Sequence, residues 1–541
     1  MLKLLLNSIA RPDLALPRFL AALTGVLLVL AYPKFDLGFI TWFALIPLFY
    51  AARGRSLRDG FWIGWLAGFV FFVGAFYWLW HVTIAGWILV AMYMAIYFGL
   101  WSLAITAATR RFSSGGIGAN LALMLLLSAA WVTQEWLRGY VITGFPWNKL
   151  GDSQHANSGA ALGLAQIADI TGVYGISFIL CLFNLGIVLT VERFRRDHGF
   201  GRRPHVELFV AVGLVLLAWN YGARAVLRYH PGGEPLTVTL IQPNVPQEVK
   251  EDKALSDLSR KLLRDLTEKA ISVSKPQLIL WPETATPEYF RWDKECFQTI
   301  SNAVTRTGAY LMTGSMDLDG YENPKTARSY NAVFMVQPNL RHQKPYWKMH
   351  LVPFGEFVPF ERWLPFMKYL TPIPGSFDSG TEYTLQHLDS PPVNIAPLIC
   401  FEDTFAYLPR NFVKRGATLL VNVTNDGWFK TSAGAYQHAA CAIFRAIETR
   451  TPMIRCANNG LSGYVDPLGR IDKDNYIHGG PKDDIFIAGW KTLTVPVSPA
   501  NVSRPLTFYV RYGDVFAFAC IGLTLLWAMV EMFMRKWNRQ T

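Results

Sequence analysis

The sequence carries little charge for its length. Of its 541 residues, 17% are charged, 52% are hydrophobic and 14% are aromatic, a balance too apolar for an ordinary soluble enzyme. The apolar residues form long runs over roughly the first 227 positions and again near the end, whereas 235–500 has the composition of a globular protein. No repeat or low-complexity segment is present. The sequence therefore joins two physical classes, membrane helices and a globular part.

Several motifs that would identify other protein classes are absent. The six cysteines include no CxxC, and no histidine pair has metal-ligand spacing, so we expect no metal and no cofactor. No GxSxG elbow supports serine hydrolase chemistry, and no basic patch interleaved with aromatic residues supports nucleic-acid binding. The spacing of Cys296, Cys400, Cys441 and Cys456 leaves a disulfide among them open.

The apolar runs predict membrane-spanning helices, which need about 20 apolar residues each. We expect eight, near 17–32, 38–52, 61–82, 85–109, 119–137, 171–191, 206–223 and 513–534. The first could be the core of a signal peptide, but no small-residue cleavage site follows it. An uncleaved first helix is the better interpretation.

The distribution of lysine and arginine predicts the topology. Both termini and every second loop are basic, and together these segments hold sixteen Lys and Arg against five Asp and Glu. The positive-inside rule therefore puts both termini in the cytoplasm and the globular part on the opposite side. The basic residues of these segments account for most of the formal charge of +12. The helix centres are almost free of ionisable residues, which argues against a transporter.

The globular part alternates strand-like and helical segments. Strands are expected near 236–244, 276–288, 309–316, 329–337, 394–400 and 417–426, and helices near 255–273 and 433–450. This alternation is typical of a layered α/β domain. The predicted division is seven membrane helices in 1–230, a catalytic domain at 231–505, and an eighth helix with a cytoplasmic tail at 506–541.

Polar, reactive residues appear where these strands stop. Glu283 ends one strand, Lys348 and His350 close the stretch "PYWKMH", Cys400 ends another strand, and Asn425 and Asp426 end a further one. Each alone could simply terminate a buried strand, but α/β sheets assemble their sites at strand ends. A carboxylate can deprotonate a thiol, and a lysine can stabilise the oxyanion formed when the thiolate attacks a carbonyl.

The motifs around these residues resemble a known superfamily. "WPETATP" with Glu283, "KMHLVPFGEFVP" with Lys348 and Glu356, and "LICFED" with Cys400 resemble the Glu–Lys–Cys signatures of the nitrilase (carbon–nitrogen hydrolase) superfamily. Attached to membrane helices, and together with "TNDGWF" (424–429), "GFPW" (144–147) and "WVTQEWLRG" (131–139), they resemble the bacterial apolipoprotein N-acyltransferases in particular. The likeness covers nearly the whole chain.

The resemblance implies a fold and a set of roles. It implies an α-β-β-α sandwich attached to a multi-pass helical membrane part in the bacterial inner membrane, with the catalytic domain in the periplasm. It makes Glu283 the general base, Cys400 the nucleophile and Lys348 the oxyanion partner, supported by Glu356 and Glu402. Phe401 departs from the tyrosine expected at its position.

The same resemblance implies the reaction. Cys400 would take a fatty acyl chain from a membrane phospholipid as a thioester and pass it to the N-terminal α-amine of the diacylglyceryl-cysteine of an apolipoprotein, completing lipoprotein maturation. The alternative is a membrane-tethered amidase or nitrilase, in which water resolves the thioester formed from a small C–N substrate.

An oily segment at 360–377 fits lipid substrates. Its apolar side chains include Trp363, Phe366, Met367 and Tyr369, which would be costly to expose to water. The functional interpretation is a substrate lid at the membrane surface, and the alternative is an ordinary core-packing loop. Outside the motifs, Glu135 and Arg138 are best explained as a structural ion pair, and His350 and His438 as hydrogen-bonded packing residues.

Overall fold

The chain forms two compact units. The structure is a computed structural model that describes residues 12–112, 116–155, 159–196, 205–251, 255–323, 326–359, 376–480 and 484–540. One unit comprises Met1–Leu227 with Tyr512–Thr541, and the other comprises Arg228–Arg511. Below they are called the membrane unit and the catalytic unit.

The membrane unit is helical. Its helices are α2 (Ala15–Leu30), α3 (Ile46–Ala52), α4 (Leu57–Ala75), α5 (Ile84–Arg111), α6 (Ile117–Arg138), α7 (Gly159–Ala165), α8 (Ala168–Thr171), α9 (Val173–Arg196), α10 (Val206–Arg228) and α17 (Val515–Gln540). Six of the described helices, α4, α5, α6, α9, α10 and α17, are long and apolar enough to cross a membrane.

Two expected spans form only short helices. Helix α2 has 16 residues, as many as the expected range 17–32, which is about 24 Å of helix against a hydrocarbon core of about 30 Å. The segment expected to be one helix at 38–52 is a 3-10 turn, Gly38–Trp42, followed by the short helix α3. A proline lies in the first turn of α3, a position that suits the start of a helix and not its interior.

Small residues let two of the spanning helices pack closely. A Cβ added at Gly64 on α4 would lie 2.5 Å from the backbone oxygen of Phe98 on α5, and one at Gly60 would lie 2.2 Å from the Thr106 hydroxyl. Four-residue spacing of glycines places them on one helix face and permits backbone approach. The glycines of "RDGFWIGWLAG" therefore permit the close α4–α5 contact.

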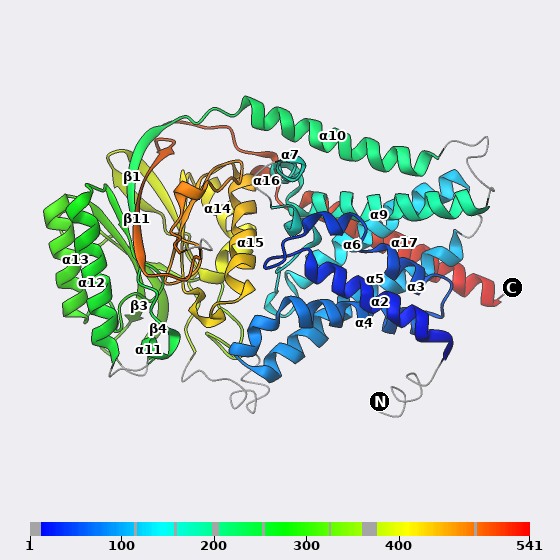
Figure 1. Cartoon of the computed structure of the whole chain (residues 1–541), viewed down its shortest axis with the longest axis horizontal. Coiled ribbons are helices and arrows are strands. Elements are labelled where there is room, and N and C mark those ends of the chain that lie inside the picture. The colour runs from blue at the N-terminus through cyan, green and yellow to red at the C-terminus, as the bar shows by residue number, and fades with distance from the viewer. Residues whose placement is uncertain are drawn as a thin grey trace. The chain divides into compact units, whose positions relative to one another are not determined.

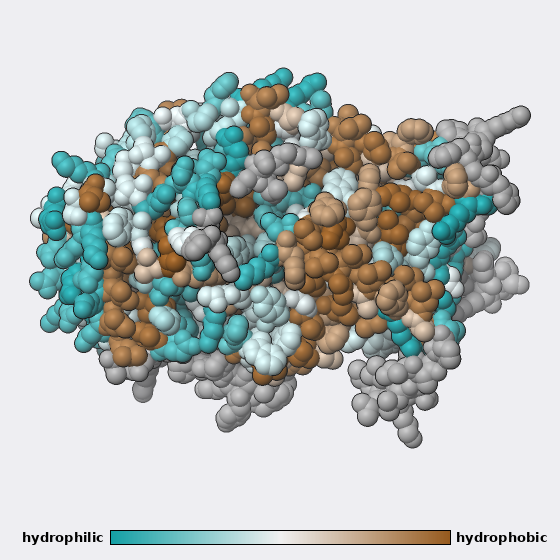
Figure 2. Space-filling view, in the orientation of Figure 1, coloured by the Kyte–Doolittle hydropathy of each residue, from teal (hydrophilic) through white to brown (hydrophobic). Residues whose placement is uncertain are grey.

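The surface of the membrane unit is apolar where its helices are exposed. Figure 2 shows hydrophobic residues gathered over these helices, and polar residues over much of the visible face of the catalytic unit. Leu217 on α10 and Phe533 on α17 are 71% and 66% exposed. Exposed apolar faces of this extent are stable in lipid and not in water, so this is a membrane protein.

The catalytic unit contains two sheets. The first has strand order β11-β1-β2-β3-β4-β5 and the second β10-β9-β8-β7-β6 among the described residues. The first comprises β1 (Glu234–Gln242), β2 (Leu278–Leu280), β3 (Tyr310–Asp319), β4 (Arg328–Val336), β5 (Tyr346–Trp347) and β11 (Gly489–Val497). The second comprises β6 (Gln386–Asp389), β7 (Pro392–Ile399), β8 (Leu419–Thr424), β9 (Met453–Ala457) and β10 (Gly463–Val465). In each sheet the central strands are parallel, β1-β2-β3 and β7-β8-β9.

Helices cover the outer faces of both sheets (Figure 1). Helices α12 (Ser256–Val273) and α13 (Lys294–Thr307) pack on the first sheet through a core that includes Leu263, Ile300 and Phe334. Helices α14 (Tyr407–Lys414) and α15 (Ala433–Thr449) flank the second sheet, and the short helices α11 (Gln247–Glu251) and α16 (Phe508–Tyr512) complete the unit. The result is the expected α-β-β-α order.

The strand expected at 276–288 is much shorter than predicted. It ends at Leu280, and the chain then turns through Pro282 and Thr284, whose φ is +43°. Proline lacks the ladder donor and a positive φ leaves the β region, so the strand cannot continue. Gly314 on β3 makes room for this turn, because a Cβ there would lie 2.6 Å from the Cα of Glu283.

Candidate active site

The five carboxylate, ammonium and thiol residues singled out by the motifs lie at strand ends or in the loops that follow them. Glu283 follows β2, Lys348 follows β5 and Cys400 follows β7. Glu356 lies in the loop after Lys348, and Glu402 in the 3-10 turn Cys400–Thr404. Lys348, Glu402 and Glu283 are 1%, 0% and 6% exposed, so their charges depend on protein partners instead of water.

Lys348 lies between two glutamates. Its Nζ is 2.9 Å from Oε1 and 2.8 Å from Oε2 of Glu356, and 3.6 Å from Oε1 of Glu283. Burial opposes the charge on Lys348, but the two carboxylates outweigh it and raise its pKa above the ordinary value. Lys348 is therefore a fixed ammonium group with its stem buried.

Asn331 on β4 joins the two glutamates. Its Nδ2 donates to Oε1 of Glu283 and to Oε1 of Glu356, each at 2.8 Å. Its Oδ1 is buried and has no hydrogen-bond partner among the described residues. The amide therefore donates a hydrogen bond to each carboxylate and lies between them. Sequence reasoning missed Asn331, whose only signal is a polar residue within the apolar strand "SYNAVFMV".

Cys400 has a backbone conformation that side chains rarely adopt. Its φ is +50°, in the left-handed region. Asn422 Nδ2 and His438 Nε2 donate to its carbonyl at 3.0 and 3.2 Å. These bonds stabilise the sharp turn from β7 into the 3-10 turn. Strained backbone of this kind is common at functional sites.

The electrostatics around Cys400 favour a neutral thiol at rest. Burial raises the pKa of Cys400 well above its ordinary value; nearby Glu283 and Asp426 raise it further, while Lys348 lowers it. A thiol in this state is a poor nucleophile until a base removes its proton. Glu283, whose Oε2 accepts the backbone N–H of Asn425 at 2.9 Å, is the carboxylate that acts most strongly on the thiol.

Glu402 organises the loops on both sides of the site. Its carboxylate accepts the Tyr346 hydroxyl at 2.8 Å and the backbone N–H groups of Met349, His350 and Ile399 at 2.7, 3.0 and 2.8 Å. Burial raises the pKa of Glu402 to about 7, against the opposing effects of Lys348 and these hydrogen bonds. Its partners are structural, since they fix the segments that carry Lys348 and Cys400.

A buried network of four charged groups lies behind Cys400. His438 on α15 places Nδ1 2.7 Å from Asp426 and Nε2 2.9 Å from Asp403, and Arg455 pairs with Asp403 and lies 3.6 Å from Asp426. Despite burial, the two carboxylates raise the pKa of His438 to about 9. His438 is therefore an imidazolium that donates from both ring nitrogens. The sequence predicted a hydrogen-bonded packing residue at His438 but not its positive charge.

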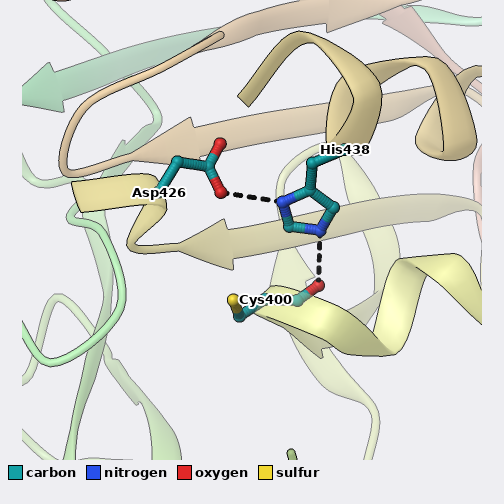
Figure 3. A group of neighbouring side chains, drawn as sticks. All are labelled: Cys400, Asp426 and His438. Atoms are coloured by element: carbon teal, nitrogen blue, oxygen red, sulfur yellow. Dashed lines mark hydrogen bonds and ion pairs between the residues drawn. The ribbon is translucent and has the colours of Figure 1, made fainter. Parts of the chain in front are cut away.

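Cys400, Asp426 and His438 lie close enough to hold a cation by distance alone. Figure 3 shows the Cys400 carbonyl directed at the ring, with the sulfur on the other side of the residue. Because both ring nitrogens face carboxylates and Arg455 already neutralises the pair, His438 has no lone pair to offer a metal. The residues fit a balanced hydrogen-bond network better than a metal site.

Two further expectations concern the neighbourhood of the site. The predicted lid residues Trp363, Phe366, Met367 and Tyr369 lie outside the described residues. Phe401 is 5% exposed and packs edge-to-face with Phe405, at 4.9 Å between ring centroids. At this position the described structure therefore places an apolar ring in the core.

Comparison with known proteins covers both units. A family described as "Apolipoprotein N-acyltransferase N-terminal domain" matches residues 24–186, and one described as "Carbon-nitrogen hydrolase" matches 237–476. An apolipoprotein N-acyltransferase of Geobacter metallireducens is 34% identical over 534 residues, which cover 94% of this chain and 95% of that protein. The chain belongs to the apolipoprotein N-acyltransferase family.

Other members of the apolipoprotein N-acyltransferase family match over similar lengths. The relative from Chlorobaculum tepidum is 30% identical, and the alignment covers 97% of this chain and 98% of that protein. Among solved structures, a nitrilase-superfamily protein of Saccharomyces cerevisiae is 16% identical, covers 50% of this chain and 92% of its own, and has a TM-score of 0.37. The two family matches and the relatives from Geobacter and Chlorobaculum confirm the family resemblance expected from the motifs, with a carbon–nitrogen hydrolase domain in the C-terminal half.

Membership of this family supports acyltransferase activity. The membrane helices and the carbon–nitrogen hydrolase domain belong to one architecture shared with relatives matched over nearly their whole length. The geometry adds an ammonium, Lys348, within 3.6 Å of two carboxylates, and the charges of Glu283 and Lys348 both act on the pKa of the Cys400 thiol.

Proposed function

We propose that the protein transfers a fatty acyl chain from a membrane phospholipid to the N-terminal α-amine of a diacylglyceryl apolipoprotein. The observation that carries the proposal is the buried Lys348 ammonium, 3.6 Å from Glu283 and 2.8 Å from Glu356, with Glu283 and Lys348 both acting on the pKa of the Cys400 thiol. A neutral thiol beside a carboxylate and a permanent cation is suited to nucleophilic attack on an ester carbonyl.

The first half-reaction makes a thioester. The Glu283 carboxylate takes the thiol proton as the Cys400 sulfur attacks the ester carbonyl, and the Lys348 ammonium stabilises the oxyanion. The tetrahedral intermediate then collapses: the C–O bond to the glycerol breaks, Glu283 returns its proton to the departing oxygen, and a lysophospholipid leaves. The acyl chain is now bound to Cys400.

The second half-reaction repeats the chemistry with an amine. The α-amino group of the lipidated cysteine attacks the thioester, Glu283 accepts a proton from nitrogen, and the C–S bond breaks as the thiol is restored. Glu356 and Asn331 contribute by holding Lys348 and Glu283 in place. Glu402 contributes by fixing the backbone around Met349 and Ile399.

Intact mass measurement tests the proposal. The purified protein and its Cys400→Ala variant are incubated with a phospholipid, and we expect a fatty-acyl mass increment on the wild type alone. A diacylglyceryl lipopeptide should discharge the adduct and become N-acylated, whereas water should not. Absence of an adduct with any phospholipid would contradict the proposal, and rapid discharge by water would favour the amidase alternative.

We further propose that the catalytic unit lies in the periplasm, with membrane helices in 1–230 and 506–541 around a catalytic domain at 231–505 and both termini in the cytoplasm. The support is the charge asymmetry of the loops. A cysteine introduced at Val273, 75% exposed on α12, should react with a membrane-impermeant maleimide in cells whose outer membrane is permeabilised. Labelling that requires lysis of the inner membrane would refute this topology.

A further inference from the structure

A cavity of about 430 Å³ lies at one end of the membrane unit. Residues at the ends of α3, α5, α6 and α9 line it, and its charged lining residues are Arg53, Glu192, Arg193, Arg195 and Arg196. Four guanidinium groups thus converge on one hollow with a single lining carboxylate. Two of the four are paired with glutamates, Arg53 with Glu192 and Arg193 with Glu207. The site therefore keeps an excess of positive charge, which favours an anion.

One of these arginines forms the wall of the cavity. Arg193 is 3% exposed, and its Nη1 lies 2.8 Å from Oε2 of Glu207. Asn120 donates to Oε1 of the same carboxylate at 2.6 Å. Because Glu207 is fully buried, this bridge between α6, α9 and α10 is structural and fixes the base of the site.

The other arginines face outward. Arg53 pairs with Glu192, and their side chains are 45% and 27% exposed. An exposed pair of this kind contributes little to stability and can exchange its partner. Arg195 and Arg196 are exposed on the last turn of α9. The Arg53 and Arg195 side chains can therefore turn toward an anion that enters the cavity.

Apolar side chains form much of the remaining lining, beside Thr109 and Asn120. Phe49 of α3, Leu123 of α6 and Leu189 of α9 line the same hollow. A site with arginines at its charged end and hydrocarbon walls matches a molecule that is an anion at one end and hydrocarbon at the other. Basic pockets between membrane helices bind lipid headgroups by this chemistry, and arginine binds phosphate oxygens bidentately.

We propose that this cavity binds the phosphate of an anionic membrane phospholipid, with Arg53 and Arg195 as its main contacts. The lipid is a bound, non-reacting ligand at the basic ends of the helices, which the charge pattern assigns to the membrane surface. The proposal does not depend on the acyl-transfer mechanism, since its test measures binding.

The experiment is native mass spectrometry of the full-length protein in detergent. Delipidated protein is titrated with phosphatidylglycerol, with zwitterionic phosphatidylethanolamine of the same acyl chains, and with inorganic phosphate. The test variant is R53Q/R195Q. The control variant R55Q/R110Q removes two charges at nearby helix ends, from residues that do not line the cavity. Thermal unfolding verifies that all three proteins are folded.

We expect the wild type and R55Q/R110Q to bind phosphatidylglycerol in preference to phosphatidylethanolamine. R53Q/R195Q should bind it about 30-fold more weakly, as expected for two contacts of about 1 kcal/mol each. Equal losses in the two double variants would overturn the proposal, because they would indicate general charge attraction. Competition by inorganic phosphate at the same concentration as the lipid would also overturn it, by showing a free-anion site.

Discussion

Replacing Asn331 by aspartate should disable the proposed base more than replacing it by leucine does. In the structure the Asn331 amide donates to both Glu283 and Glu356 at 2.8 Å. A carboxylate in its place would lie at the same distance from two others, with Lys348 as the nearby cation. Each new pair repels by about 6 kcal/mol at 2.8 Å and an effective dielectric constant of about 20.

The three carboxylates relieve this repulsion by binding one more proton at neutral pH. A proton shared with Glu283 removes the base for the attack of Cys400, and loss of general base catalysis costs about 10²- to 10⁴-fold in rate. Asn331→Asp should therefore slow Cys400 acylation by about 10³-fold, and the rate should recover partly as the pH rises and the extra proton dissociates.

The assay is intact mass of samples quenched during acylation at pH 6 to 9. Asn331→Leu is the essential comparison, since it removes both donated hydrogen bonds and adds no charge, so its rate should fall without an alkaline shift of the pH profile. Asn394→Asp on β7, where the amide donates to the Gly416 carbonyl, controls for added charge elsewhere in the unit. An Asn331→Asp enzyme with the wild-type pH profile would refute the reasoning.

Three further predictions concern the buried charges. Lys348→Met leaves the Glu356 carboxylate without its cation, and should lower the free energy of unfolding in urea by about 3–5 kcal/mol. A second change, Glu356→Gln, should restore part of this loss. Equal stability of the single and double variants would contradict the pairing. The pKa of about 9 for His438 lies above its unfolded value of about 6.5, so its stabilisation is complete below pH 6.5 and lost as the pH rises through 9. The unfolding free energy of wild type relative to His438→Gln should therefore fall by about 3 kcal/mol over that window, and a pH-independent difference would exclude a buried imidazolium. Alkylation of Cys400 by iodoacetamide should still be accelerating at pH 9, because its pKa is raised; a plateau below pH 8 would indicate a resting thiolate.

Much of the fold follows from local pattern. Runs of about 20 apolar residues are membrane helices because lipid offers no partner for free backbone groups, and six of the predicted spans have helices of that length. The pattern failed where backbone chemistry intervened: Pro282 and Thr284 end the strand that apolar residues alone would extend to 288. The four-residue glycine spacing on α4 was present in the sequence as well, but its partner α5 was not identifiable from it.

The sequence by itself determined which residues carry reactive groups and that each follows a strand. Glu283, Lys348 and Cys400 were found in this way because strand ends have a local signature. Only the tertiary structure decided how these charges are balanced. Asn331 is 48 residues from Glu283 and 25 from Glu356, and His438 is 38 from Cys400. Such contacts depend on strand order and on the packing of sheets and helices, so no local pattern encodes the bridge between the glutamates or the imidazolium behind the thiol.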